Sequence, residues 1–299
     1  MTIIDAIRTR CESVLTDEPM HRHTSFKIGG AADILAFPKT TEELILLWKF
    51  CRENDVPITI LGDGANVLVA DDGIRGVVVF TNKMRGTEIL QSEKIRAESG
   101  VRLAALAEKA AAAGLSGLEF SCGIPGTVGG AIYMNAGAYG HDISGLTESV
   151  TMFSNGEILI KSGEEMDFGY RKSLAQTCDA LILDATFCLS RAEPEKIREV
   201  MADLNARRRK SQPLEFGSAG SFFKRPEGYF AGKLVEDSGL KGFRVNDAQV
   251  SEKHAGFVVN RGDATARDVL ALMHHVQDTV YEKFGVRLEP EVRILGEKV

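Results

Sequence analysis

The chain has 299 residues, of which 44% are hydrophobic and 26% charged, and its formal net charge is −6. This composition is ordinary for a globular protein of two or three domains, and the negative charge argues against general nucleic-acid binding. No apolar run approaches the roughly 20 residues of a membrane helix, and the N-terminus lacks the apolar core and cleavage site of a signal peptide. These features predict a cytosolic protein.

The first third of the chain predicts a helix followed by a small α/β unit. A capping box at Thr40 and Glu43 predicts where the second helix begins. The expected elements are a short amphipathic helix over 1–18, a strand over 32–37, a helix from 41 to about 54, and strands at 56–61, 67–69 and 76–80.

The remainder predicts two further units. Asn155-Gly156 predicts a hairpin turn, and Thr265 with Asp268 forms a second capping box. The expected elements are strands within 87–99, a helix over 103–113, antiparallel strands at 148–153, 158–160 and 180–189, a helix over 194–210, a loop- and strand-rich segment over 217–262, a helix ending at 284 and a strand over 288–295.

The stretch from Ser116 to Gly140 is the most informative part of the sequence. Seven of its 25 residues are glycine, and large apolar residues lie between them, unlike in a flexible linker. Glycine lets backbone N–H groups approach an anion or a flat ring closely. The stretch is therefore either a buried glycine-rich turn or a cofactor cradle, and the spacing favours the cradle.

A second glycine loop spans 61–66 between two apolar runs. A strand, a glycine turn and another strand aim successive N–H groups at one point, which suits a pyrophosphate. The sequence contains neither a G-x-G-x-x-G fingerprint after a first strand nor a G-x-x-x-x-G-K-[ST] motif, which argues against a Rossmann domain and a P-loop. Two distant glycine loops predict a long ligand with two phosphates lying between two sub-domains.

The cysteines and histidines indicate neither a disulfide framework nor a metal site. The five cysteines are scattered without a C-x-x-C pair, which favours reduced thiols. Cys122 lies inside the glycine stretch, but no neighbouring base is visible, so we interpret it as a small packing residue. The basic run 207–210 is either a solvated helix end or contains an arginine that reaches a phosphate.

Several ordered motifs together resemble the UDP-N-acetylenolpyruvoylglucosamine reductase (MurB) family. The resemblance extends from about residue 20 to the end of the chain. The motifs are Thr24–Gly30, the loop 61–66, Gly117–Phe120 running into Gly123–Gly126, Ser218–Lys224, Ala231–Leu234, Ser251–Phe257 and Glu291–Arg293.

The resemblance implies an α+β fold with a two-lobed FAD-binding region of the vanillyl-alcohol-oxidase type and a smaller α/β substrate-binding domain. It implies a shorter form of the family, with an N-terminal helix (1–20), FAD sub-domains (21–86 and 87–192), a substrate domain (193–286) and a C-terminal strand returning to the active site (287–299). One departure is Asp63, where the family usually has a glycine. Because an acid would repel a pyrophosphate, we expect this side chain to point away.

The implied reaction is the NADPH-dependent reduction of an enolpyruvyl UDP-sugar to UDP-N-acetylmuramate in peptidoglycan synthesis, with non-covalent FAD as the cofactor. The implied catalytic residues are Arg171 for the substrate carboxylate, Ser221 as proton donor and Glu291, which orients or polarises the carboxylate end. An ionised Glu291 would oppose the developing charge, which favours its protonated form. Without the resemblance, each residue has an ordinary structural explanation: a surface arginine, a turn serine and a salt-bridge partner of Arg293.

The remaining implied site residues fall into two sets. The cofactor set lies in the two glycine loops and comprises Leu61, Gly62, Asp63, Gly64, Ala65, Asn66, Gly123, Ile124, Pro125, Gly126, Thr127, Gly129, Gly130, Ala131 and Asn135. The substrate set comprises Tyr170, Arg208, Lys233 and Arg293. We expect a monomer with a UDP-sugar substrate and no nucleic-acid, membrane or metal partner.

Two other functions remain open from the sequence. The first is another FAD-dependent oxidase on the same fold, which often carries a flavin linked to a histidine or cysteine. The second is a non-redox nucleotide-sugar binding module, which would be colourless when purified, whereas a flavoprotein is yellow.

Overall fold

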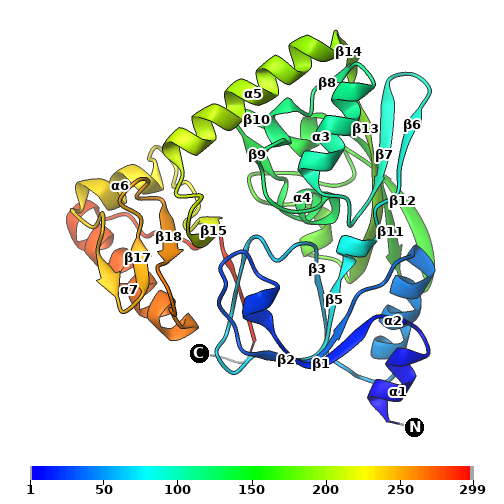
Figure 1. Cartoon of the computed structure of the whole chain (residues 1–299), viewed down its shortest axis with the longest axis horizontal. Helices are drawn as coiled ribbons and strands as arrows, with labels where there is room; N and C mark the ends of the chain where they lie inside the picture. The colour runs from blue at the N-terminus through cyan, green and yellow to red at the C-terminus, as the bar shows by residue number, and fades with distance from the viewer. Residues whose placement is uncertain (1, 297–299) are drawn as a thin grey trace. The chain divides into compact units, whose positions relative to one another are not determined.

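The computed structural model describes residues 2–296 and divides the chain into two compact units. Unit 1 comprises residues 1–15, 35–63 and 78–208, and unit 2 comprises 16–34, 64–77 and 209–299. Each unit has its own cluster of buried apolar side chains. Figure 1 shows the elements of both units, with labels on most of the helices and strands.

Unit 1 is built on a five-stranded antiparallel sheet in the order β12-β11-β13-β7-β6. The tight turn between β11 and β12 uses Asn155 (φ 50°) and Gly156 (φ 86°), as the sequence predicts. Its strands are β6 (Thr87–Leu90), β7 (Lys94–Glu98), β11 (Thr147–Ser154), β12 (Glu157–Ser162) and β13 (Ala180–Cys188).

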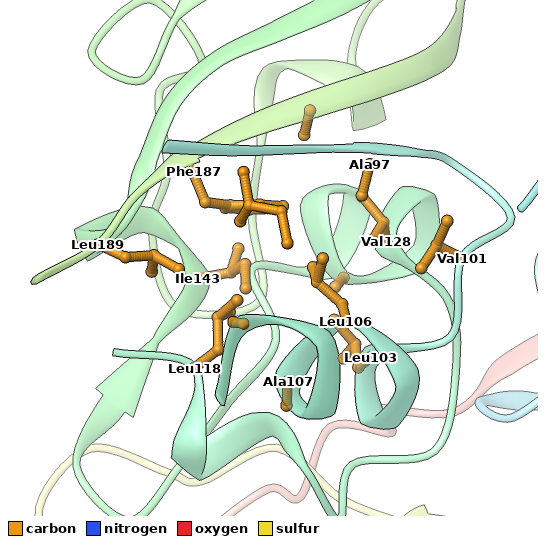
Figure 2. Close-up of a cluster of buried hydrophobic side chains, with 14 of the residues drawn as sticks. Ala97, Val101, Leu103, Leu106, Ala107, Leu118, Val128, Ile143, Phe187 and Leu189 are labelled. Atoms are coloured by element: carbon orange, nitrogen blue, oxygen red, sulfur yellow. The ribbon is translucent and has the colours of Figure 1, made fainter. Parts of the chain in front are cut away.

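Helices cover one face of this sheet. Helix α4 contacts β13 and β7, and α3 packs into the same apolar cluster. Figure 2 shows Leu103 and Leu106 of α3 in one buried cluster with Val128 of α4 and Phe187 of β13. The other elements with this unit's residues are α2 (Thr41–Glu53), α3 (Leu103–Ala112), α4 (Val128–Met134), α5 (Pro194–Ser211), β8 (Leu115–Ser116), β9 (Gly137–Ala138), β10 (His141–Asp142), β14 (Ser190–Arg191) and the short 3-10 helices at 81–83, 119–121, 143–145 and 174–176.

Unit 2 contains a four-stranded antiparallel sheet in the order β15-β18-β17-β16. Helix α7 packs on β16 and β17 and contacts α6. The parallel pair β4–β19 joins Val67–Val69 to Arg293–Leu295. The elements are β4 (Val67–Val69), β15 (Gly217–Ser221), α6 (Ala231–Asp237), β16 (Arg244–Val245), β17 (Ala248–Val250), β18 (Phe257–Asn260), α7 (Ala266–Phe284), β19 (Arg293–Leu295) and a 3-10 helix at 20–22.

The predicted N-terminal helix over 1–18 is wrong in extent. Helix α1 spans only Ile3–Arg8, and the capping box of Thr2 and Asp5 stabilises its N-terminus. Residues Val14–Pro19 form strand β1. Its sheet has the strand order β1-β2-β5-β3, and the other strands are β2 (Ala31–Ala36), β3 (Ile58–Leu61) and β5 (Ile74–Phe80). The apolar residues at 14 and 15 therefore continue a strand rather than a helical face.

The other expected elements are largely confirmed, with three differences. Helices α4 and α6, of seven residues each, were not predicted, because they are short and contain glycine, which lowers helix propensity. The terminal strand is shorter than 288–295: Pro290 forms only an isolated bridge to Phe223, and regular pairing begins at Arg293. Residues 297–299 of the predicted C-terminal segment 287–299 lie outside the described residues.

Candidate active site

The two predicted glycine loops meet within unit 1. Strand β3 ends at Leu61, and a Cβ placed on the next residue, Gly62, would overlap the Oγ1 atom of Thr127. Thr127 is the N-terminal cap residue of α4, but its side chain makes no capping bond. The absence of a side chain at Gly62 therefore permits the first loop to touch the start of the second loop's helix.

Buried polar atoms without a protein partner surround this meeting point. They include Thr127 Oγ1, Ser99 Oγ and Asn82 Oδ1. Gly129 donates its N–H to the carbonyl of Ser99 at 2.8 Å, and a Cβ on Gly129 would crowd the Ser99 side chain. A buried hydroxyl or amide oxygen without a partner is costly, so these atoms fit a polar ligand such as the ribityl and diphosphate part of FAD.

Asp63 does not stand alone in the first loop. Arg102 donates from Nε to Asp63 Oδ2 at 2.6 Å and from Nη2 to Oδ1 at 3.4 Å. Asn82 donates from Nδ2 to the same Oδ1 at 3.4 Å. From the sequence, an acid at this position is expected to repel a phosphate. In the structure, the guanidinium of Arg102 binds this carboxylate.

Arg208 lies against the second glycine loop. A Cβ on Gly123 would lie 2.9 Å from Arg208 Nε and 2.7 Å from Asn205 Oδ1. That Nε atom is buried without a protein partner. Burial raises the pKa of the neighbouring Cys122 thiol, which keeps it neutral and agrees with a packing role. The structure therefore places Arg208 of α5 against the predicted cofactor loop, where an anionic group would satisfy its Nε atom.

Arg171 is held in an unusual backbone conformation. Its φ is +55°, a region that residues with a side chain seldom adopt. Its Nη1 donates to the carbonyl of Asn135 at 3.3 Å, and the guanidinium lies 5.1 Å from the ring centre of Tyr170. Tyr170 itself is 56% exposed.

Two amide side chains fix this loop to the end of α4. Asn135 donates to the carbonyl of Gly169 at 2.9 Å and accepts from the N–H of Ser144 at 3.1 Å. Gln176 donates to the carbonyls of Tyr133 at 2.6 Å and Arg171 at 3.0 Å. These bonds satisfy carbonyl groups at the end of α4 and support the left-handed backbone of Arg171.

Ser221 and Glu291 lie on adjoining backbone segments of unit 2. Strand β15 ends at Ser221, which pairs with Phe257 of β18. The next residue, Phe222, accepts a bond at 2.9 Å from the N–H of Glu291. Phe223 bridges to Pro290, so residues 289–291 continue the pairing along 222–224. Two residues 70 positions apart in sequence are thereby brought together.

The end of the first glycine loop reaches the same segment. Asn66 donates from Nδ2 to the carbonyl of Glu291 at 3.1 Å, and its own carbonyl accepts from the N–H of Arg293 at 3.0 Å. Gly64 approaches His23 closely, and its carbonyl accepts from the N–H of Ser25. The motif at 24–30 therefore supports both the loop and β15, where Ser218 donates its N–H to the carbonyl of Ser25 at 3.1 Å.

The other predicted cofactor and substrate residues differ in their exposure and in their contacts. Lys233 is exposed on α6 and pairs with Asp237 one turn later, and the Arg293 side chain is also exposed. Ala131 points into the core of unit 1 rather than toward the loops. Ala65 is partly exposed, and Pro125 and Gly130 are exposed. Ile124 packs against the core, and the carbonyl of Gly126 accepts from the N–H of Leu103.

Two family models match the chain. Residues 32–167 match the FAD binding domain, and residues 212–295 match the C-terminal domain of UDP-N-acetylenolpyruvoylglucosamine reductase. The reductase of Caldanaerobacter subterraneus is 51% identical over 283 residues, which are 94% of this chain and 93% of that protein. The chain belongs to the UDP-N-acetylenolpyruvoylglucosamine reductase family.

Solved structures agree with this membership. The crystal structure of the family's enzyme from Thermus caldophilus is 35% identical, has a TM-score of 0.80, and covers 95% of this chain and 98% of its own. A berberine-bridge-like protein of Physcomitrella patens matches with a TM-score of 0.51 at 14% identity over 64% of this chain and 45% of its own, which shows the fold alone. The expected α+β fold with an FAD-binding region of the vanillyl-alcohol-oxidase type is confirmed.

As a member of this reductase family, the protein is an FAD-dependent oxidoreductase that uses NADPH. Within residues 2–296, no group of histidine, cysteine or acidic side chains could hold a metal ion. Among the same residues, no helix is both long and apolar enough to cross a membrane.

Sequence reasoning missed several residues that the structure gathers at these groups. Arg102, Asn82 and Ser99 belong to no recognisable motif, and Gln176 lies in a short 3-10 helix. Arg102 and Asp63 are 39 positions apart, so no local spacing could indicate their pairing.

Proposed function

We propose that this protein reduces the enolpyruvyl ether of UDP-N-acetylglucosamine enolpyruvate to UDP-N-acetylmuramate, with Arg171, Ser221 and Glu291 as its catalytic residues. Membership of the reductase family supports the reaction. The hydrogen-bonded pairing that brings the segment of Glu291 beside that of Ser221 is the observation that carries the assignment of these two residues.

Each residue suits one requirement of the reaction. FAD held by the two glycine loops and reduced by NADPH would supply the hydride that C3 of the enolpyruvyl group receives. Arg171 binds the substrate carboxylate, on which negative charge increases, and a guanidinium remains charged while doing so. Ser221 donates a proton at C2, because the carbanion-like intermediate is a far stronger base than an alkoxide. Glu291 orients the carboxylate end of the substrate.

FAD and the UDP-sugar would bind to different parts of the chain. We assign FAD to residues 21–86 and 87–192, with the glycine loops at 61–66 and 123–130 next to the diphosphate. We assign the UDP-sugar to residues 193–286 and the C-terminal segment, with Tyr170, Lys233 and Arg293 as substrate contacts. The unpartnered Nε of Arg208 beside Gly123 supports a phosphate contact for that residue.

We also propose a cytoplasmic monomer without nucleic-acid partners. The five cysteines are free, in agreement with a reducing compartment. The net charge of −6 is unfavourable for binding nucleic acid.

The decisive experiment mixes the purified yellow protein with NADPH and UDP-N-acetylglucosamine enolpyruvate. We expect NADPH oxidation that depends on the sugar, equal molar formation of UDP-N-acetylmuramate by mass spectrometry, and release of free FAD on denaturation. NADPH oxidation that depends on oxygen and is unaffected by the sugar would contradict the proposal and favour an oxidase.

A further inference from the structure

Asp63 of the first glycine loop forms an ion pair with Arg102, a residue that belongs to no predicted motif. Asp63 directly follows Gly62, the residue that touches Thr127. Its side chain is 14% exposed, whereas that of Arg102 is 64% exposed. A carboxylate in a loop that presents N–H groups to a diphosphate would oppose the ligand's charge unless a cation accompanies it.

The backbone on both sides of Arg102 is fixed by the core of unit 1. Its neighbours Val101 and Leu103 are 4% and 1% exposed, and Figure 2 shows both in the buried cluster that also contains Val128. Arg102 also bridges to Thr127 through its backbone, and Leu103 donates to the carbonyl of Gly126 at 3.1 Å. The guanidinium is therefore anchored to the second glycine loop while it binds the acid of the first.

Three hydrogen-bond donors, two of them from Arg102, face the carboxylate of Asp63. Nε and Nη2 both point at the carboxylate of Asp63, and Asn82 adds a third donor to Oδ1. An arginine that engages a carboxylate through two nitrogens cancels its charge more rigidly than a lysine would. The unpartnered oxygens of Asn82 and Thr127 lie in the same group of residues, which ties the pair to the ligand site.

We propose that Arg102 is a positioning residue for FAD: it neutralises Asp63 so that the loop at 61–66 can accept an anionic diphosphate. This inference rests on the proposed function and deepens it for the cofactor. The role is charge cancellation rather than direct contact with the diphosphate, and this distinction decides the design of the test.

The test measures the dissociation constant of FAD from apoprotein by flavin fluorescence, at low and high salt. In Arg102→Ala, Asp63 keeps its charge, and we expect FAD binding to weaken by about tenfold to a hundredfold at low salt, as expected for charges a few ångströms apart near a protein surface. High salt should reduce the difference, because it screens exposed charges. In Asp63→Asn/Arg102→Ala, both charges are absent, and binding should return to within about threefold of wild type.

A matched control is Arg198→Ala, which removes another arginine that pairs with an acid in unit 1, Glu108, at 3.1 Å. It should bind FAD as wild type does. The double variant also tests for misfolding, because it lacks Arg102 as well. Recovery of FAD binding in it would show that loss of the arginine does not by itself disrupt the fold.

Two results would overturn the inference. Arg102→Ala that binds FAD like wild type would show that Asp63 needs no neutralisation. A double variant as weak as Arg102→Ala would show that Arg102 contacts the cofactor directly. If instead the wild-type apoprotein bound no FAD at all, the proposed function itself would fail, so the two failures are distinguishable.

Discussion

The two units hold their candidate catalytic groups in different ways. In unit 1, Arg171 lies in a loop with a left-handed backbone, supported by the side chains of Asn135 and Gln176. In unit 2, Ser221 ends a strand, and the segment of Glu291 is joined to it by backbone hydrogen bonds. A ladder of backbone bonds keeps its geometry when a side chain is exchanged, whereas a loop supported by side chains does not. We therefore expect distant substitutions to disturb Arg171 more than Ser221.

The largest expected effect comes from Ser221→Ala. Because the strand pairing is made by the backbone, the variant should keep its fold and bind FAD. Loss of a positioned proton donor should slow turnover of the enolpyruvyl sugar by about 10²- to 10⁴-fold. Rapid-mixing measurements should find reduction of bound FAD by NADPH nearly unchanged, with only the step that uses the sugar slowed.

A matched control lies on the same strand. Ser218→Ala removes a hydroxyl three residues away that has no proposed role, and it should retain nearly full turnover. Equal slowing of both half-reactions in Ser221→Ala would count against the role of Ser221 as proton donor.

A smaller effect is expected from Gln176→Ala, which tests the side-chain support of Arg171. The variant loses bonds to the carbonyls of Tyr133 and Arg171. Since a left-handed residue costs roughly 1–2 kcal/mol, the loop should relax toward other conformations. We expect about a tenfold rise in the KM for the enolpyruvyl sugar, with a smaller fall in kcat and no change in reduction of FAD by NADPH.

The neighbouring Thr177→Ala provides the comparison, because the Thr177 hydroxyl donates to the carbonyl of Leu174 at 3.0 Å rather than to Tyr133 or Arg171. It should leave the KM unchanged. If both variants behaved alike, the support attributed to Gln176 would be merely a general contribution to folding.

The smallest effect concerns unit 2 and pH. Burial lowers the pKa of His254, the charge of Lys241 adds to this and that of Glu236 opposes it, and Nδ1 accepts from the N–H of Gly256 at 3.1 Å. Below about pH 6.5 the unfolded chain therefore binds more protons at this residue than the folded protein. The free energy of unfolding should fall as the pH drops from about 7 toward the lowered pKa of the folded state.

Urea unfolding at several pH values measures this effect. In His254→Gln the fall in stability over that range should be shallower than in wild type, while His21→Gln, at an exposed position, should keep the wild-type slope. A slope unchanged in His254→Gln would mean that other groups control the acid sensitivity.

Local patterns in the sequence determined much of this protein. Capping residues and periodicity predicted α2, α3, α5 and α7, and Asn-Gly predicted the turn between β11 and β12. The ordered motifs predicted the family, since each needs only a few adjacent residues to be recognised. Helix α6 and the true extent of α1 were missed, because sheet pairing and core packing override weak propensities in short segments.

Only the tertiary structure decided how distant residues combine. It supplied the partner of Asp63, the meeting of Gly62 with Thr127, and the pairing of residues 289–291 with 222–224. The physical reason is that such contacts depend on how the chain closes long loops, which no local spacing records. The sequence thus determined which chemical groups are available, and the tertiary structure decided which of them act on one another.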